Sequence, residues 1–449
     1  PATGEIVPAV QIGTLAPGSG TPFQGMKVFN EEIMRGRPLI VVPRVGFALD
    51  LFGNGKTAIR GGFGMFPGRI PDDQTATHIT QPPLFSNRTL NYTTISELTN
   101  ATPTFTPVNV LGVQHEHDAP TVYNMSFGVQ QDIGFNTIFD VAYVGSLSRH
   151  LQQQRSLNAV PYGTNAQPSS IDPTSPNSPL PINFLRPIQG YGDITYNELA
   201  SNSSYHSMQT QLNRRFSKGL MFGVAWTWSK TMNLVDGNNV LNPFMDPRTW
   251  HYGKAGYDRT HTLVINYTYQ IPGLSRFLNN NAVAKGVFDG WELAGVTSFL
   301  SGEPQGVSYT LTTTSDLTKG GGNGVTARPD LAMNPILPKS ERTPLRAFRT
   351  EAIVAPADPF GRGNAPKDVF RGPGVNNWDV TLNKTFNFNE GKMVQFRFET
   401  YNTFNHTQFS GVETAARFDA AGNQVNQRFG QYTSARDARK VQVGLKFAF

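Results

Sequence analysis

The chain has 449 residues, of which 16% are charged and 38% hydrophobic, and its formal net charge is +6. The charged fraction is low for a soluble domain, where about a quarter is usual, and the absence of cysteine excludes disulfides and thiolate metal sites. No apolar run approaches the ~18 residues of a membrane-spanning helix, so a membrane protein with this sequence must be a closed β-barrel. The scattered basic residues include no basic helix or aromatic stacking motif, which argues against nucleic acid as a partner.

Paired strands joined by short turns are predicted through the first half of the chain. Asn54-Gly55 favours a type I′ hairpin turn, because both central positions of that turn need positive φ. Apolar and polar residues alternate in these strands, as in 220–230, which predicts one apolar and one polar face. The predicted pairs are 38–51 with 56–66, 121–133 with 135–147, and 205–216 with 220–230.

A longer turn joins the next two predicted strands, 261–271 and 291–311. Ser301–Pro304 could be a turn or a bulge within the second of these. We interpret it as a bulge, because a turn would reverse the side of every loop upstream. A further hairpin joins 379–389 with 393–405.

The final strand, residues 440–449, alternates strictly and ends on an aromatic residue. A soluble sandwich would seldom leave five apolar side chains on one face of an edge strand. Gln442, Gly444, Phe447 and Phe449 resemble the closing-strand signal of bacterial outer-membrane β-barrels. That resemblance implies the barrel-assembly machinery as a partner.

The arrangement of turns and loops favours an all-β, antiparallel, up-and-down transmembrane barrel. Outer-membrane barrels have short periplasmic turns and long extracellular loops, and the long segments all fall on one side: 67–120, 148–204, 231–260, 312–375 and 406–438. About eleven strands result, and an odd number does not close an antiparallel barrel. We therefore expect 38–449 to be the C-terminal half of a barrel of roughly 22 strands. Residues 1–37 would be an extracellular loop of a truncated upstream hairpin.

Aromatic residues fit the same orientation. Such side chains form belts at both surfaces of a membrane, although they also fill any β core. The predicted belt residues are Trp226, Trp228 and Trp378 at extracellular ends and Tyr267, Tyr269 and Phe388 at periplasmic ends.

Several stretches resemble the barrel of TonB-dependent receptors, in particular the Oar-like type of acidobacteria and myxobacteria. They are 43–50, 55–66, 258–261, 290–295, 397–406 and 435–439. The resemblance implies energised uptake across the outer membrane of a Gram-negative bacterium, with membrane lipid around the barrel. Family members carry a plug, a TonB-contacting segment and a periplasmic domain before the barrel. TonB is thus expected to act only through parts that this chain lacks.

Two clusters could bind ligands. His115 and His117, two residues apart on an extended strand, could share a cation, although a solvated rim is the simpler interpretation. A polar, aromatic loop is expected to recognise an extracellular ligand, while Asp258 and Arg259 beside it are expected only to brace the loop. The predicted ligand-binding residues are Asp246, Arg248, His251, Tyr252 and Tyr257.

Catalytic residues and cofactors are not predicted. Glu399 and Asp379 could form a carboxylate pair near Arg397, but barrel lumens are routinely polar, so a structural role is preferred. Gly61–Gly64 lies within a strand with no following helix and is not a phosphate loop. The leading hypothesis is a transport barrel that captures ligand with its loops and passes it through the lumen. The alternatives are a barrel or sandwich adhesin that binds a polymer and, least favoured, a glycan-active enzyme.

Overall fold

The computed structural model describes residues 34–35, 39–69, 80, 94–97, 107–175, 178–188, 190–237, 239–277, 281–312, 324–388 and 392–449. Most of the predicted extracellular segment 1–37 and residues 313–323 of the glycine-rich loop lie outside this part of the chain. None of the described helices is long and apolar enough to cross a membrane.

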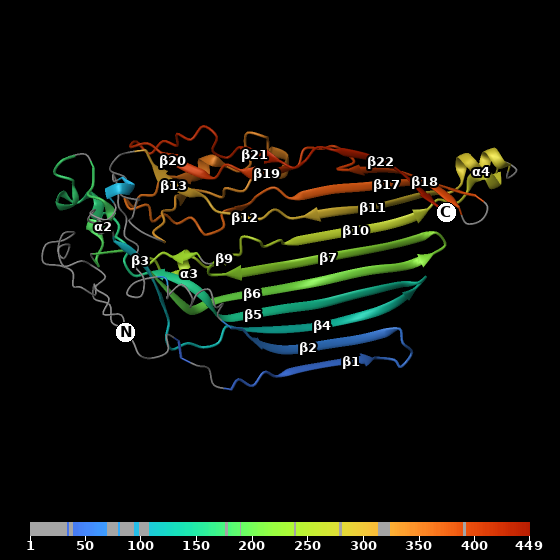
Figure 1. The fold of residues 1–449 in the computed structure, drawn as a ribbon, viewed down its shortest axis with the longest axis horizontal. Coiled ribbons are helices and arrows are strands. Elements are labelled where there is room, and N and C mark those ends of the chain that lie inside the picture. Colours follow the sequence, from blue (N-terminus) through green and yellow to red (C-terminus); the bar gives the residue numbers. More distant parts are fainter. Residues whose placement is uncertain are drawn as a thin grey trace.

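Eleven consecutive antiparallel strands form the main path of one curved 14-stranded sheet, with short turns at one end and long loops at the other (Figure 1). The predicted strand order is therefore confirmed. In order across the sheet the strands are β1 (Arg44–Asp50), β2 (Thr57–Pro67), β4 (Thr121–Gly134), β5 (Thr137–Ser156), β6 (Tyr191–Ser217), β7 (Leu220–Asn233), β10 (His261–Gln270), β11 (Trp291–Leu300), β17 (Val375–Asn387), β18 (Met393–Tyr401) and β22 (Lys440–Ala448).

The register of the sheet keeps apolar side chains on one face. Between β18 and β22, for example, Phe398 lies opposite Val443 and Phe396 lies opposite Leu445. Leu445 is 60% exposed and Phe447 is 64% exposed. A second sheet would cover this face in a sandwich, whereas a barrel presents it to lipid. The exposed face therefore favours the barrel over the sandwich.

Several strand bounds differ from the prediction. β1 begins at Arg44, not at residue 38. The connection to β2 has positive φ at Gly53 and Gly55 but not at Asn54, so the predicted type I′ turn at Asn54-Gly55 is wrong. β5 and β6 run well beyond residues 147 and 205 into the predicted loop, which shrinks to 157–190. The extensions are mostly polar, although Tyr191 and Leu199 are buried there, and the pairing of β5 with β6 continues through them with register shifts.

The prediction of a single strand over residues 291–311 is also wrong. β11 ends at Leu300. The Ser301 N–H still donates to the His261 carbonyl of β10, but the His261 N–H donates to Ser301 Oγ in place of a backbone carbonyl, and the chain then leaves the sheet. The next strands, β12 (Pro304–Gln305) and β13 (Ser308–Leu311), pair with β16 (Phe370–Arg371) and β20 (Ala415–Phe418) among the outer loops. The long loops still lie on one side of the sheet, as predicted, because neither short strand joins the main sheet.

The two outer loops 301–374 and 402–439 fold together around a hydrophobic core, which we call the outer-loop unit. Phe348, 1% exposed, stacks on Phe370 with ring centroids 4.4 Å apart and meets Phe429 edge-on at 5.3 Å. The buried residues of this core are Val307, Tyr309, Ala347, Phe348, Ile353, Ala365, Val369, Phe370, Ala416, Phe418 and Phe429. The predicted loops are therefore compact where the structure describes them.

Shorter elements complete the described chain. The remaining strands are β3 (Val108–Val113), β8 (Val240–Leu241), β9 (Gly253–Lys254), β14 (Asp330–Leu331), β15 (Ile353–Val354), β19 (Phe409–Val412) and β21 (Tyr432–Ala435). The α-helices are α2 (Ile182–Leu185), α3 (Pro247–Trp250) and α4 (Ala282–Phe288). The 3-10 helices are η3 (Ile95–Glu97), η4 (Thr164–Ala166), η5 (Pro168–Ser170), η6 (Leu274–Phe277), η7 (Lys339–Glu341) and η8 (Thr350–Ala352).

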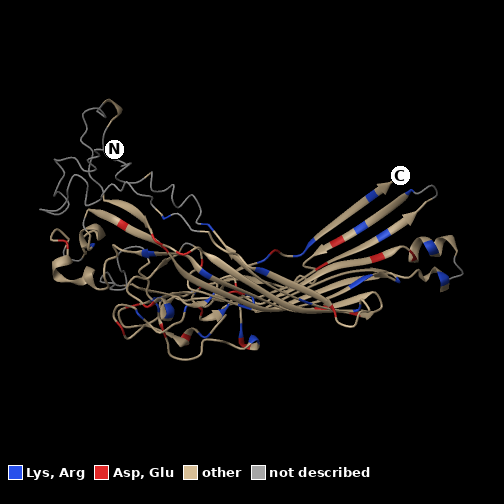
Figure 2. Ribbon diagram, turned by 90° about the horizontal axis from the view of Figure 1, so that it is seen from below, with Lys and Arg blue, Asp and Glu red and all other residues tan. Residues whose placement is uncertain are grey.

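The sheet does not close on itself. Within the described ranges β1 pairs only with β2 and β22 only with β18, and the sheet is a curved, open layer (Figure 2). The antiparallel strands and their order are confirmed, whereas half of a 22-stranded barrel stays a prediction.

Candidate functional site

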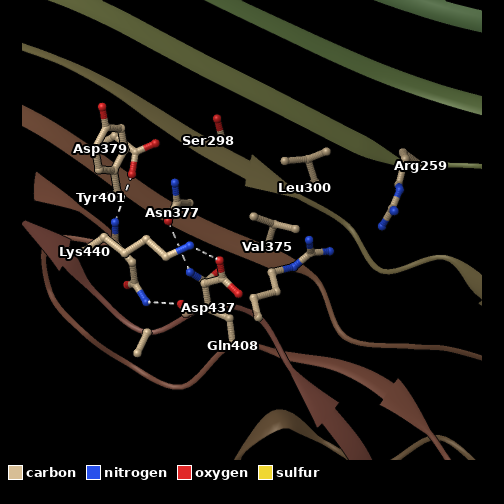
Figure 3. Close-up of a pocket in the computed structure, with 13 residues that line it drawn as sticks. Arg259, Ser298, Leu300, Val375, Asn377, Asp379, Tyr401, Gln408, Asp437 and Lys440 are labelled. Atoms are coloured by element: carbon tan, nitrogen blue, oxygen red, sulfur yellow. Dashed lines mark hydrogen bonds and ion pairs between the residues drawn. The ribbon is translucent and has the colours of Figure 1, made fainter.

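A cavity of about 910 Å³ lies where β11, β17, β18 and β22 reach the outer loops (Figure 3). Its walls come from the polar face of these strands and from the loop between β18 and β22. The lining residues are Arg259, Ser298, Leu300, Val375, Asn377, Asp379, Tyr401, Asn402, Gln408, Arg436, Asp437, Ala438 and Lys440.

Strand register places the polar side chains of the cavity on one face. Asn377 lies opposite Ser298, and Lys440 lies opposite Tyr401. All four belong to the face opposite the apolar one, because side chains alternate across a strand. In a barrel this face lines the lumen, so the cavity lies at the outer end of the lumen wall.

Hydrogen bonds hold the carboxylates of the cavity in place. The Asn402 backbone N–H donates to Asp379 Oδ1 at 2.9 Å, and Asn402 Nδ2 donates to the Asp437 carbonyl at 3.2 Å. Lys440 Nζ pairs with Asp437, and this hydrogen bond and charge lower the pKa of the Asp437 carboxyl below its usual value. Both acidic residues are therefore engaged in contacts within the protein.

The basic side chains are less fully engaged. Arg259 donates to the Ser301 carbonyl at 2.6 Å and pairs with Glu303. The exposed Arg436 guanidinium makes no hydrogen bond or ion pair within the described ranges. The lining residues thus offer a free cation and several amide and hydroxyl groups, but no histidine or cysteine. Such a set can bind a polar or anionic ligand, and it offers no nucleophile with a base beside it.

Two of the five predicted ligand-binding residues have structural roles. Asp246 is the N-cap of α3, where its Oδ1 accepts from the Arg248 N–H at 3.0 Å and the Thr249 N–H at 2.9 Å. His251 Nε2 accepts from the Asn242 N–H at 2.8 Å. Burial, with Arg328 and Lys367 nearby, lowers the pKa of His251 to about 4. Both side chains therefore have hydrogen-bonding roles within the loop, although Asp246 is also exposed.

The other three predicted residues are more accessible. Arg248 and Tyr252 line a separate cavity of about 460 Å³ together with Arg149. Tyr257 is 64% exposed, and partial burial of its hydroxyl, with Asp236 nearby, raises its pKa. The structure therefore does not bring the five residues into one site, and their ligand-binding role stays a prediction.

Asp258 and Arg259 brace the loop as predicted, but they do so through other residues and not by an ion pair with each other. The Asp258 side chain has no exposed surface, forms an ion pair with Arg371 and accepts from the Thr231 N–H at 2.6 Å. Arg259 turns instead toward Glu303 and the Ser301 carbonyl. Together these contacts tie β7 and β10 to the outer-loop unit.

The histidine cluster has other contacts. Glu116 pairs with Arg35 at 2.9 Å, Asp118 lies 3.6 Å from His150, and His117 Nδ1 lies 3.2 Å from the His115 carbonyl. Among the residues that the structure describes, no group of three or more His, Cys, Asp or Glu could hold a metal ion. The solvated rim is the interpretation that these contacts support.

The carboxylate pair proposed for catalysis is also engaged otherwise. Arg397 pairs with Glu399 at 2.7 Å, and the Tyr401 hydroxyl donates to Glu399 at 3.4 Å. Asp379 accepts from Asn402 rather than sharing a proton with Glu399. These contacts fit the structural role that the sequence favoured.

Of the predicted belt residues, Tyr269 and Phe388 lie at the short-turn ends of β10 and β17, whereas Trp226 lies midway along β7. The predicted assembly residues Gln442 and Gly444 lie within β22. Trp228, near the loop end of β7, is 52% exposed, and Phe388, at the opposite end of β17, is 58% exposed. Gln442 and Gly444 share the polar face of β22, with Phe447 on the other face. The belt and the assembly signal stay predictions about partners.

Sequence reasoning missed most of the cavity. Tyr401 and Asn402 lie in one stretch that resembles the receptor family, and Arg436 and Asp437 lie in another, which was the available signal. What could not be read from the sequence is that the loop between them folds back onto β17, where the Asn376 N–H donates to Gln408 Oε1 at 3.0 Å.

A family model described as an outer membrane beta barrel domain matches residues 8–442. No curated protein sequence matches the chain.

Similar solved structures include the outer membrane transporter YddB from Escherichia coli, with 10% identity, a TM-score of 0.45, and coverage of 89% of this chain and 39% of that one. The ferric-catecholate import receptor Fiu from E. coli has 7% identity, a TM-score of 0.39, and coverage of 90% and 34%. BauA, the ferric preacinetobactin receptor from Acinetobacter baumannii, has 9% identity, a TM-score of 0.39, and coverage of 90% and 36%. The chain therefore spans less than half the length of these proteins.

Proposed function

Because the chain belongs to the outer membrane beta barrel domain family, we propose that it forms the C-terminal part of a TonB-dependent transport or receptor barrel. The protein lies in the outer membrane of a Gram-negative bacterium. The TonB-dependent part of the proposal is supported by the sequence stretches that resemble Oar-like receptors.

The single observation that carries the proposal is the cavity at the outer end of the polar face. It lies where a ligand captured by the loops would enter the lumen, and Arg436 offers a guanidinium that has no partner in the part of the chain that the structure describes. The ligand would first contact the outer-loop unit and Arg436. It would then pass along the polar residues of β11, β17, β18 and β22 when a plug supplied by the rest of the protein is moved.

An adhesin is the second candidate, favoured by the compact outer-loop unit. Its packed aromatic core gives a stable surface that could bind a polymer without transport. The two functions differ in their need for energy. Only transport requires the plug to be moved.

The experiment uses intact cells and an antibody to residues 376–449. A heat-modifiable outer-membrane band about twice the 49.3 kDa of this chain, or larger, is the expected product of a half-barrel within a transporter. A band at the mass of this chain alone would contradict the half-barrel.

Energy dependence then separates transport from adhesion. Candidate ligands that bind these cells should enter them only while the inner membrane is energised, and collapse of the proton gradient should abolish entry but not surface binding. Surface binding with no energy-dependent entry for any bound ligand would favour the adhesin. Arg436→Ala should weaken ligand binding, whereas Arg417→Ala, in the outer-loop unit away from the cavity lining, is the matched control.

A further inference from the structure

The turn between β10 and β11 is longer than the other short turns at its end of the sheet, and it has structure of its own. It contains η6 and α4, and α4 projects beyond the strand ends on the side opposite the long loops (Figure 1). The Asp289 carboxylate joins the two helices, because it accepts from the Ser275 N–H at 3.1 Å and from Ser275 Oγ at 2.6 Å. We call the described residues 271–277 and 281–290 the turn unit.

Two residues attach the turn unit to the apolar side of the sheet. Trp291 Nε1 donates to the Val287 carbonyl at 2.8 Å, and Lys384 Nζ donates to the Asp289 carbonyl. Trp291 and Lys384 lie opposite each other in the register, on the same face as the pair Leu293 and Leu382. The turn unit therefore continues the face that a barrel presents to lipid.

The surface of the turn unit is apolar with basic residues beside it. Ser275 and Ala284 point inward and are at most 5% exposed, whereas large apolar side chains point outward. Arg276 and Lys285 are exposed, and neither has a carboxylate ion-pair partner among the residues that the structure describes. The outward apolar residues, with their exposed fractions, are Leu274 (46%), Phe277 (72%), Val283 (77%), Val287 (52%) and Phe288 (41%).

We propose that the turn unit lies in the periplasmic leaflet of the outer membrane and binds phospholipid there. The five apolar side chains enter the acyl boundary, while Arg276 and Lys285 meet anionic headgroup phosphates. Amphipathic segments with this division of side chains lie in the plane of a membrane interface. Lipid is the occupant that the geometry favours, because the turn unit is continuous with the lipid-facing surface and its exposed cations match the phosphates, although Arg276 also lies over the Phe277 ring at 4.9 Å and Lys285 lies near Asp289.

Depth labelling tests the proposal in the intact protein in its outer membrane. This chain has no cysteine, so Val283→Cys adds one site to it for an environment-sensitive fluorophore, and labelling of the protein without the substitution gives the background. The matched control is Asn54→Cys, in the short β1–β2 turn at the same end of the sheet. The label at 283 should emit at shorter wavelength than the label at 54, be quenched by a lipid-borne quencher, and resist a water-soluble one.

Charge reversal tests the headgroup contact. In vesicles that contain phosphatidylglycerol, Arg276→Glu or Lys285→Glu should lower the ratio of lipid-inserted to water-exposed label about fivefold each. In vesicles of phosphatidylcholine alone the same substitutions should have little effect. Heat-modifiable migration establishes that each variant is folded before it is compared.

Two outcomes would overturn the proposal. Equal access of the water-soluble quencher to the labels at 283 and 54 would mean that the turn unit stands in water. Protection of the label at 283 from both quenchers would mean that another protein, or a second copy, covers it.

Discussion

Asp258 holds the outer ends of β7 and β10 to the outer-loop unit through a side chain with no exposed surface. Its carboxylate meets Arg371 and the Thr231 N–H, so both oxygens have partners. Removing one partner of a buried ion pair leaves an uncompensated charge, which is more costly than losing an exposed pair.

Asp258→Asn should therefore loosen this joint. We expect the free energy of local opening to fall by about 2–3 kcal/mol, less than for a fully buried pair because Arg371 is 27% exposed. Hydrogen exchange at the Thr231 amide measures the change. Asp437→Asn, whose side chain is 78% exposed, should change local opening far less, and equal effects of the two variants would contradict the assignment.

His251 should make the loop around α3 sensitive to acid. Its pKa is lowered from 6.5 to about 4 in the folded protein, so between these values the unfolded loop binds more protons. The free energy of unfolding of this loop is then highest above pH 6.5, falls as the pH decreases toward 4, and stays constant below pH 4. The total loss is on the order of 1–3 kcal/mol.

Limited proteolysis of 231–260 across that pH range measures the effect. His251→Gln should remove the pH dependence, because the amide can still accept a hydrogen bond but does not titrate. A pH dependence that persists in this variant would assign it to another group.

At the scale of elements, the main strands could be predicted because their two faces meet different surroundings. Alternation marks β7, β10 and β22 along most of their length. The first part of β6, near the outer loops, has no such alternation, because the backbone hydrogen bonds of the strand continue there beyond the region with an apolar face. Nor does alternation reveal β12 and β13, whose partners are distant in sequence and depend on how the loops fold.

The apolar face of β22 should be essential for insertion. Leu445→Arg places a charge near the middle of this strand on its exposed apolar face and should cost about 2–4 kcal/mol. Thr381→Arg, on the polar face of β17 opposite Glu399, should be tolerated. The folded fraction and the urea midpoint of heat-modifiable protein in outer membranes measure both, and equal tolerance would mean that this face does not meet lipid.

At the scale of the whole molecule, hydrophobic packing is concentrated outside the sheet. The outer-loop unit has a packed core of its own, while the apolar face of the sheet is exposed. Its existence could not be predicted, because the residues that pack together come from two loops separated by β17 and β18. The candidate cavity escaped prediction for the same reason, since half its wall depends on where the second loop returns.

Phe348→Ala should destabilise the outer-loop unit by about 3–5 kcal/mol, because the ring is buried between Phe370 and Phe429. Proteolysis should then cut both loops while the sheet stays protected. Leu345→Ala, at a side chain that is 69% exposed, is the control and should leave the loops resistant. Cleavage of only one loop in Phe348→Ala would show that the two do not share a core.

A shared core reduces the number of independent motions available above the lumen. Since 301–374 and 402–439 bury one another's side chains, neither loop can swing away without exposing the core of both. A ligand that binds only one arrangement of the first loop therefore also favours one arrangement of the second loop. The coupling free energy between the two loops is the same in both directions. We therefore expect ligand binding on the outer-loop unit to affect the mouth of the cavity, where Arg436 lies at the end of the second loop.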